Sequence, residues 1–339
     1  MQTIRAAAKD RMRGYCRVCP ICNGVACAGE VPGMGGLGTG AAFRNNLSAL
    51  ASLRLNMRLL HEADTPDTAT QFLGQPLAIP VMAAPIGGVS FNMGGAMSED
   101  DYILAKLEGC QAQGILGCTG DGVPPFIHEA AFAAIRAVDG HGIPFIKPWE
   151  DNALFEKLEQ AVDTGAPAVG MDIDAAGLIT LKQMGRPVGP KSPAKMKRII
   201  EQVPVPFILK GIMTADQARI AVDVGAKAIV VSNHGGRVLD HAPGAAEVLP
   251  EIADAVRGQI AILADGGIRS GVDVLKMLAL GADAVLIGRP FSIATIGGQS
   301  EGVGAYIEQI KTELQSAMVL TGCADLNAIR RDILRPAAG

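Results

Sequence analysis

Aromatic residues and long apolar runs are scarce in this chain of 339 residues. Phe, Trp and Tyr make up 4% of it, although 49% of the residues are hydrophobic and 42 are glycine. We therefore expect a largely aliphatic core connected by many tight loops. No run reaches the 18 or more apolar residues of a membrane-spanning helix. The composition predicts a globular protein with a large buried core.

An excess of positive charge is also missing. The formal net charge is −4, which argues against a nucleic-acid or anionic membrane surface as the main partner. Residues 1–17 are basic but have no apolar stretch like that of a secretory signal, so a solvated surface helix is the favoured interpretation. Seven cysteines, an odd number, fit a reducing compartment better than a disulfide framework. We expect a cytoplasmic protein.

Short apolar runs recur along the chain and are bounded by glycine or proline. Because they are continuous rather than alternating, they are typical of strands buried on both faces. Stretches of helical length separate them, such as Thr214–Val224 and Ser270–Leu280, each with a hydroxyl residue in the position of an N-cap. The predicted strands are Pro80–Ala84, Gly114–Thr119, Pro144–Trp149, Ala168–Ile173, Pro206–Gly211, Ala228–Asn233, Ala261–Gly266 and Ala284–Arg289.

Eight strand–helix units predict an α/β fold in which a parallel sheet closes into a (β/α)₈ TIM barrel. An open doubly wound sheet is the main rival, but no early strand–helix turn carries a G-x-G-x-x-G dinucleotide fingerprint. We expect one barrel domain over residues 80–339. Residues 1–79 form an N-terminal extension, which we expect to cap the amino-terminal mouth of the barrel or to contribute a subunit contact.

The loops after the seventh and eighth predicted strands each pair glycine with arginine. They read DGGIR over 265–269 and IGRP over 287–290. Glycines let backbone N–H groups approach an anion, and a following helix N-terminus favours negative charge. Each loop alone could be an ordinary turn with a surface arginine. Because barrels commonly bind phosphate at these two strand ends, the pair predicts a phosphate-bearing ligand.

A glycine-rich turn after the sixth strand carries a histidine and an arginine. It reads SNHGGR over residues 232–237. His234 can accept a proton, and Arg237 can hold a carboxylate through two parallel hydrogen bonds. Lys210, at the end of the fifth strand, can neutralise charge on a reduced cofactor ring, although a strand-end lysine can also face solvent. A proton acceptor and a carboxylate clamp on one turn favour oxidation of a 2-hydroxy acid.

The stretch from Leu209 to Pro290 closely resembles the FMN-dependent 2-hydroxy-acid oxidases and dehydrogenases, the family of glycolate oxidase and lactate oxidase. The resemblance rests on SNHGGRVLD, LKGIMTADQARIAV and LADGGIRSGVDVLKMLALGADAVLIGRP. PDT at 66–68 and MAAPI at 82–86 are similar to the lactate oxidase pattern. The similarity is strong over the C-terminal half and diluted from about residue 40 to 175. It implies that hydride passes from a small L-2-hydroxy acid to FMN, leaving a 2-oxo acid, in a homotetramer of barrels.

The resemblance also implies a role for each matching residue. His234 is the expected base, Arg237 the substrate clamp, and Asp174 the carboxylate that orients the histidine, although a turn or helix-start role for Asp174 is equally open. Lys210 is expected to stabilise the reduced flavin. The residues expected to bind or line FMN are Ala84, Pro85, Thr119, Lys210, Ser232, Asp265, Gly266, Gly267, Arg269, Gly288 and Arg289.

The chain departs from this family around the substrate. The family usually carries two tyrosines and a second arginine there, and none has a clear counterpart in this sequence. Lys147 stands about where the second tyrosine is expected, so it either contacts cofactor or an anionic substrate or faces solvent. The particular 2-hydroxy acid is therefore open. Two other functions also stay open: an FMN-dependent isomerase of the type 2 isopentenyl diphosphate isomerase kind, and a flavin-binding protein without its own substrate.

Four cysteines near the N-terminus are spaced C-x₂-C-x₂-C-x₄-C. Thiolates this close suit a Zn²⁺ ion or an iron–sulfur cluster, because short spacers let several sulfurs converge on one centre. The last spacer is one residue longer than that of the common bacterial ferredoxin run. Reduced structural or redox thiols are the alternative. The candidate ligands are Cys16, Cys19, Cys22 and Cys27.

Overall fold

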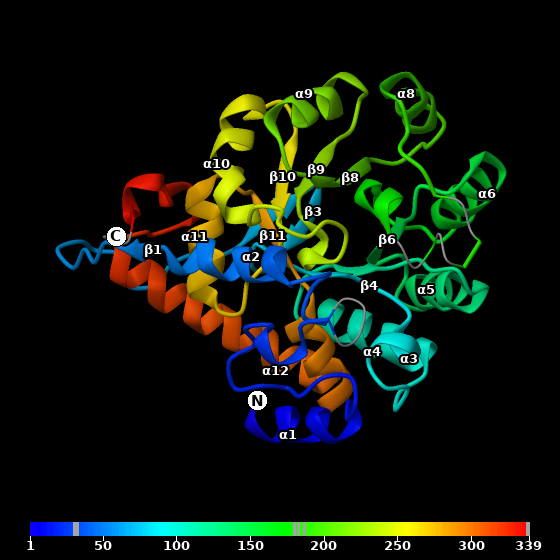
Figure 1. Cartoon of the computed structure of the whole chain (residues 1–339). Helices are drawn as coiled ribbons and strands as arrows, with labels where there is room; N and C mark the ends of the chain where they lie inside the picture. Colours follow the sequence, from blue (N-terminus) through cyan, green and yellow to red (C-terminus); the bar gives the residue numbers. More distant parts are fainter. Residues whose placement is uncertain (30–33, 179–180, 182–183, 186–187, 337–339) are drawn as a thin grey trace.

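Eight parallel strands close into a barrel, as the sequence predicts (Figure 1). This computed structural model describes residues 1–29, 34–178, 181, 184–185 and 188–336. Consecutive strands pair in parallel, and the last of them, β11, pairs with the first, β4, which completes the cylinder. The barrel strands are β4 (Val81–Ile86), β5 (Gly117–Thr119), β6 (Gly142–Ile146), β7 (Val169–Asp172), β8 (Phe207–Ile212), β9 (Ala228–Val231), β10 (Ala261–Ala264) and β11 (Ala284–Ile287).

Helices separate these strands and surround them, and this explains why the strands are apolar on both faces. Every residue of β5, β6, β7, β9 and β11 is buried. Within the described residues, no helix is both long and apolar enough to cross a membrane. The helices of the barrel are α3 (Val89–Asn92), α4 (Glu99–Ala112), α5 (Pro125–Ala137), α6 (Asp151–Val162), α8 (Pro193–Glu201), α9 (Ala215–Asp223), α10 (Ala245–Val256), α11 (Gly271–Leu280) and α12 (Arg289–Thr321).

Helix boundaries follow the capping residues closely. Ser270 precedes α11 and forms a full capping box with Asp273, and Gly281 ends the helix in the left-handed region. Thr214 occupies the N-cap position of α9 as predicted, but its side chain makes no capping hydrogen bond. A capping box of this kind contributes on the order of 1 kcal/mol.

The third barrel strand differs from its prediction. β6 begins at Gly142 and ends at Ile146, whereas the apolar run suggested Pro144–Trp149. The chain turns away after Ile146 because the buried carboxylate of Asp121 accepts hydrogen bonds from the Lys147 backbone N–H and the Trp149 indole N–H. Polar contacts of this kind end a strand where apolar composition alone does not.

The N-terminal segment lies on the barrel in two places. Helix α1 (Gln2–Arg11) packs along α12, where Arg11 donates to the Ile296 carbonyl at 2.7 Å (Figure 1). Helix α2 (Ala41–Ala51) packs on the turn η3 (His234–Gly236), and Asn46 donates to Asn233 at 2.8 Å. Helix α2 therefore lies at the carboxyl end of the barrel, whereas we expect the extension at the amino-terminal mouth or in a subunit contact.

Short elements complete the chain at both ends. The hairpin of β2 and β3 leads into the barrel, and β1 pairs in antiparallel fashion with β12 near the C-terminus. Two further one-turn helices occupy the N-terminal extension and the loop after β7. The remaining elements are η1 (Val25–Cys27), β1 (Leu53–Leu55), β2 (Thr70–Phe72), β3 (Gln75–Leu77), η2 (Ile173–Gly177), η4 (Leu326–Ala328), η5 (Arg331–Ile333) and β12 (Leu334–Pro336).

Candidate active site

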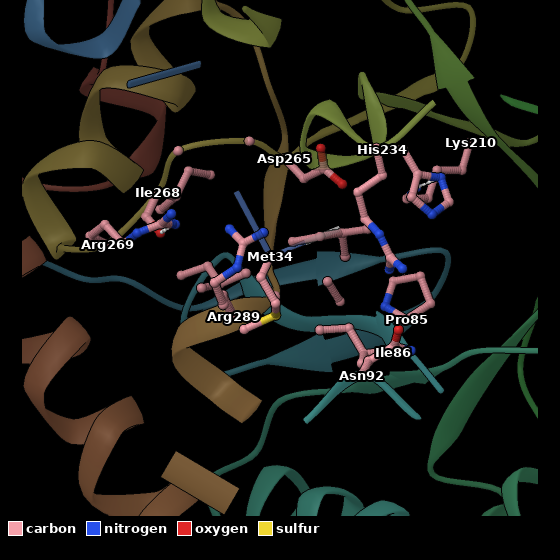
Figure 2. Close-up of a pocket in the computed structure, with 18 of the residues that line it drawn as sticks. Met34, Pro85, Ile86, Asn92, Lys210, His234, Asp265, Ile268, Arg269 and Arg289 are labelled. Atoms are coloured by element: carbon pink, nitrogen blue, oxygen red, sulfur yellow. Dashed lines mark hydrogen bonds between the residues drawn. The ribbon is translucent and has the colours of Figure 1, made fainter. Parts of the chain in front are cut away.

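An elongated cavity opens at the carboxyl ends of the barrel strands. It encloses about 830 Å³ of empty space, including its open mouth. Figure 2 shows Arg269 and Arg289 on one side of it and His234 and Lys210 on the other. The cavity therefore has a cationic end suited to phosphate and a second end that carries titratable groups. An active site in this position is the rule for barrel enzymes.

His234 lies on η3 at the second end of the cavity and is held from two sides. Its Nδ1 is 2.8 Å from Asp174 Oδ1, and its backbone N–H donates to Ser232 Oγ at 3.0 Å. Its φ of +56° lies in the left-handed region, which a non-glycine residue adopts at a cost and most often at functional positions. The contact with Nδ1 leaves Nε2 as the nitrogen that can take a proton. Asp174 therefore lies where it could orient the ring, and its orienting role stays a prediction.

Lys210, on β8, makes an ion pair that the sequence did not reveal. Its Nζ is 3.1 Å from Asp172 Oδ1 and 3.9 Å from Asp174 Oδ2, and all three side chains are nearly inaccessible. Burial alone would lower the pKa of Lys210, but Asp172 and then Asp174 outweigh it and hold the pKa above its ordinary value. Burial raises the pKa of Asp172, yet Lys210 and His234 bring it down to about 2. Lys210 is thus a permanent cation at the reactive end.

Arg237 follows η3 and lies on the wall between the first cavity and a second one. The second cavity encloses about 1010 Å³ and shares His234 and Arg237 with the first. Burial lowers the pKa of Arg237, and the nearby carboxylates of Asp172 and Asp174 work against that shift. Lys147 lines the second cavity and not the first. A carboxylate that entered the second cavity would meet both a guanidinium and an ammonium group.

The cationic end of the first cavity is built from the loops after β10 and β11. Gly266 and Gly267 adopt φ of +96° and +81°, and a Cβ on Gly266 would lie 2.6 Å from Asn46 of α2, so side chains are excluded there. Arg289 begins α12 and lies over the Phe43 ring, 4.6 Å from its centroid. Burial lowers the pKa of Arg289 to about 10, so this arginine is still charged at neutral pH.

Two buried polar atoms on this wall have no hydrogen-bond partner within the part of the chain that the structure describes. They are Asp265 Oδ1 and Arg269 Nε. Burial also raises the pKa of Asp265. Buried polar groups are almost always paired, so the orphaned atoms point to a ligand that carries both acceptors and donors. A polyhydroxy chain ending in a phosphate would satisfy both, at the end of the cavity where backbone N–H groups and two guanidinium groups converge.

The other predicted residues are placed as follows. Ala84, Pro85 and Gly288 line the first cavity. Ser232 is fully buried behind His234, and Thr119 is fully buried at the end of β5 with its hydroxyl unpaired among the described residues. Eight residues of the cavity wall were not among the predicted site residues: Met34, Ile86, Asn92, Met93, Gly235, Ile268, Leu286 and Ile287. Met34, Asn92 and Met93 lie outside the motifs on which the sequence prediction rests.

The four N-terminal cysteines line a third cavity, of about 380 Å³. Their sulfurs do not converge tightly. In the described ranges, the only three ligand atoms from His, Cys, Asp or Glu that lie within 4.8 Å of one another belong to Asp172, Asp174 and His234. A tetrahedral Zn²⁺ with sulfur ligands at about 2.3 Å needs a tighter group. The zinc alternative therefore does not agree with the positions of these side chains.

These features define a barrel oxidoreductase with an elongated, phosphate-bearing cofactor. The chain belongs to the FMN-dependent dehydrogenase family, whose model matches residues 33–186 and 181–336. FMN is accordingly the group that the first cavity fits. Its phosphate would be held by Arg269, Arg289 and the backbone of Gly267 and Gly288, with Lys210 at the opposite end.

Named relatives agree with this assignment. The chain is 33% identical to an L-lactate oxidase of Lactobacillus jensenii over 86% of this chain and 78% of that protein. It is 32% identical to an L-lactate dehydrogenase of Pseudomonas entomophila (strain L48), over 86% and 90%. Among solved structures, a crystal structure of mandelate oxidase superposes with a TM-score of 0.80 at 29% identity, covering 100% of this chain and 98% of the other. Another mandelate oxidase structure contains a C4a-OH-FMN adduct.

Replacing Arg289 by Ala should weaken FMN binding, because one of the two guanidinium groups at the cationic end is lost. A charge-assisted contact of this kind is worth about 2–5 kcal/mol when one partner is removed, so we expect at least a tenfold rise in the dissociation constant. The change is measured by titrating apoprotein with FMN. Arg13→Ala, in an exposed side chain, is the matched control and should leave the constant unchanged. Equal affinities in both variants would contradict the assignment of this end to phosphate.

Proposed function

We propose that this protein oxidises small L-2-hydroxy acids to 2-oxo acids, with His234 as the base and Arg237 as the carboxylate clamp. The observation that carries the proposal is the shared wall: both residues line the FMN cavity and the neighbouring second cavity at once. A substrate held between them has its hydroxyl near the imidazole and its C2–H directed to the cofactor side. FMN, bound in the first cavity, supplies the acceptor for the hydride.

His234 and Asp174 together remove the hydroxyl proton of the substrate. His234 takes the hydroxyl proton at Nε2, since Nδ1 is engaged by Asp174 at 2.8 Å. The imidazolium that forms is then stabilised by a carboxylate already in place, so little reorganisation accompanies the proton transfer. Lys210 keeps a fixed positive charge beside the pair. That positive charge would stabilise negative charge on the reduced cofactor.

Substrate binding falls to Arg237 and to the apolar part of the second cavity. Arg237 holds the carboxylate through its planar fork, which fixes both position and rotation of the substrate. Phe91, Ile127 and Leu178 supply apolar contacts in the wall of this cavity. We infer that the side chain of the 2-hydroxy acid is apolar and lies against them. Lys147 faces the same space, and we assign it a contact with the anionic end of the substrate.

The two competing functions have less support. The family match places the chain among dehydrogenases and not among isomerases. A diphosphate substrate would also have no use for a base and a carboxylate clamp on one turn. A flavin-binding protein without its own substrate would not need the pairing of His234 with Asp174. A base that is oriented by a buried carboxylate favours an enzyme.

The proposal is tested by mixing the FMN-loaded protein anaerobically with a series of hydroxy acids. We expect L-lactate, L-2-hydroxybutanoate and L-mandelate to bleach the visible absorbance of the flavin, because each offers a carboxylate and an apolar side chain. The D-isomers should fail, because the same carboxylate position turns C2–H away from the cofactor. A flavin-loaded preparation that no 2-hydroxy acid bleaches would remove the proposed activity and leave the fold untouched.

Two further properties stay predictions. We infer a homotetramer from the family resemblance, and exposed Met57, Leu59 and Leu60 near β1 supply apolar surface for a subunit contact. Light scattering should then give a mass four times that of the chain. The cytoplasmic location is supported by the cysteines, all seven of which are free thiols in the structure.

A further inference from the structure

The N-terminal cysteine segment lies outside the part of the chain that the family explains. The family model begins at residue 33, whereas the cysteines occupy positions 16 to 27. All four nevertheless line one cavity, which has about 380 Å³ of empty space including its open mouth. Gly24 makes this possible: its φ of +76° turns the chain back, and a Cβ there would meet the Phe43 ring at less than van der Waals distance. The longer last spacer therefore still brings Cys27 to the same cavity.

The spread of the sulfurs suits a centre larger than a single ion. No three of the four approach within 4.8 Å of one another, although all face the same space. Each cysteine of a [4Fe–4S] cluster binds a different iron, so its ligating sulfurs stand further apart than those around one zinc. Two-residue spacers between the first three cysteines match the spacing of three ligands of such a cluster, and Cys27 would supply the fourth.

Hydrogen-bond donors and positive charge are also in place around the sulfurs. The Val18 backbone N–H donates to Cys16 Sγ at 3.4 Å, and Arg269 Nη2 donates to Cys22 Sγ at 3.8 Å. Arg289 lines the cavity as well. A cluster held by four thiolates is an anion, and burying an anion requires nearby cations and N–H donors. Donors to the sulfurs are also one of the means by which proteins adjust the potential of such clusters.

The cysteine cavity shares a wall with the FMN cavity. Met34 and Arg289 line both, and Arg269 links them, since it lines the FMN cavity and donates to Cys22. From this arrangement we propose that Cys16, Cys19, Cys22 and Cys27 ligate an iron–sulfur cluster of the [4Fe–4S] type that carries electrons away from reduced FMN. The electron-transfer part of the proposal rests on the proposed function, whereas the ligand set does not.

In this proposed path, every electron removed from the 2-hydroxy acid reaches an external acceptor. Oxidation of one 2-hydroxy acid leaves two electrons on FMN. The cluster accepts one electron at a time, so two successive transfers through it reach an external one-electron carrier protein, and two protons leave for solvent. FMN returns to its oxidised form, and two molecules of carrier are reduced. Oxygen is not required in this series of electron transfers.

The site is tested on full-length protein that is prepared without oxygen. Iron, acid-labile sulfide, zinc and FMN are measured per chain, before and after incubation with Fe²⁺ and sulfide. We expect about four iron and four sulfide per chain, and an electron paramagnetic resonance signal after reduction with dithionite. Absence of iron and sulfide after incubation, or one zinc in their place, overturns the proposal. Neither outcome bears on flavin reduction by hydroxy acids, so failure here is distinct from failure of the proposed function.

Variants separate ligation from folding and test the electron path. Cys22→Ala and Cys27→Ala should each lose most of the iron but keep FMN, whereas Cys323→Ala, a buried cysteine outside the cavity, should keep both. Loss of iron in none of the ligand variants overturns the site. With L-lactate as donor and cytochrome c as acceptor, Cys22→Ala should transfer electrons at least tenfold more slowly than Cys323→Ala, at equal rates of flavin reduction. Equal transfer rates in these two variants would show that the cluster does not carry electrons from reduced FMN to the acceptor.

Discussion

Replacing His234 by Gln should slow anaerobic reduction of the flavin by L-lactate by about 10²–10⁴-fold, the usual contribution of a positioned general base. Glutamine keeps the size and polarity of the side chain but cannot accept the proton at neutral pH. FMN should stay bound, because His234 belongs to the reactive end of the cavity and not to its phosphate end. Rapid mixing under anaerobic conditions measures the rate, and the flavin spectrum of the protein measures its content.

Two further variants accompany this measurement: one tests the carboxylate beside His234, and the other is a control. Asp174→Asn should slow the same step by a smaller factor, since the amide still contacts Nδ1 of His234 but no longer stabilises the imidazolium. His61→Gln is the matched control, because His61 is an exposed histidine that bonds to the Arg58 carbonyl. It should behave as wild type. A His234→Gln protein that reduces its flavin at the wild-type rate would show that another group removes the proton.

Replacing Arg237 by Met should lower kcat/KM for L-lactate on the order of 10²- to 10³-fold. The estimate follows from a cost of about 2–5 kcal/mol for removing one partner of a buried charge pair. Methionine keeps much of the apolar stem of the side chain, so the loss reflects the guanidinium. Steady-state kinetics with an artificial electron acceptor measures the effect. Most of it should appear in KM, because the carboxylate is held before and during the reaction.

L-Lactamide, the amide of L-lactate, tests the contact between Arg237 and the substrate carboxylate more specifically. Wild-type protein should prefer L-lactate over L-lactamide by a large factor, and Arg237→Met should lose that preference, because no cation then distinguishes carboxylate from amide. Arg237→Lys should recover only part of it, since a single ammonium cannot make two parallel bonds. Arg13→Met, in an exposed side chain, is the control. A Met variant that retains the wild-type preference would contradict the role of Arg237.

The barrel and most of its site could be predicted from the sequence for a physical reason. Each buried strand is a short aliphatic run, and function in this fold collects just after such runs. His234, Arg269 and Arg289 each follow a strand directly, so their place at one end of the barrel follows from the order of elements. Gly236, Gly266 and Gly267 are required by positive φ and by close contact with α2.

What could not be predicted depends on register and on distant contacts. Asp172 and Asp174 look alike in the sequence, but only the pairing of β7 with β8 places Asp172 directly opposite Lys210. Met34 reaches the cavity from the N-terminal extension, and no local pattern says which end of the barrel that extension covers. Lys147 lines the second cavity, and this position depends on how Asp121 ends β6, which the sequence does not reveal.

The central claim is that His234 and Arg237 hold a 2-hydroxy acid so that hydride leaves C2 for the cofactor. A single-turnover bleach of the FMN-loaded protein by L-lactate tests it most directly, with ordinary and C2-deuterated substrate compared under anaerobic conditions. We predict rapid bleaching that is clearly slower with deuterium at C2, with one 2-oxo acid formed per flavin. Absence of bleaching by either substrate, or 2-oxo acid without loss of flavin absorbance, would contradict the account.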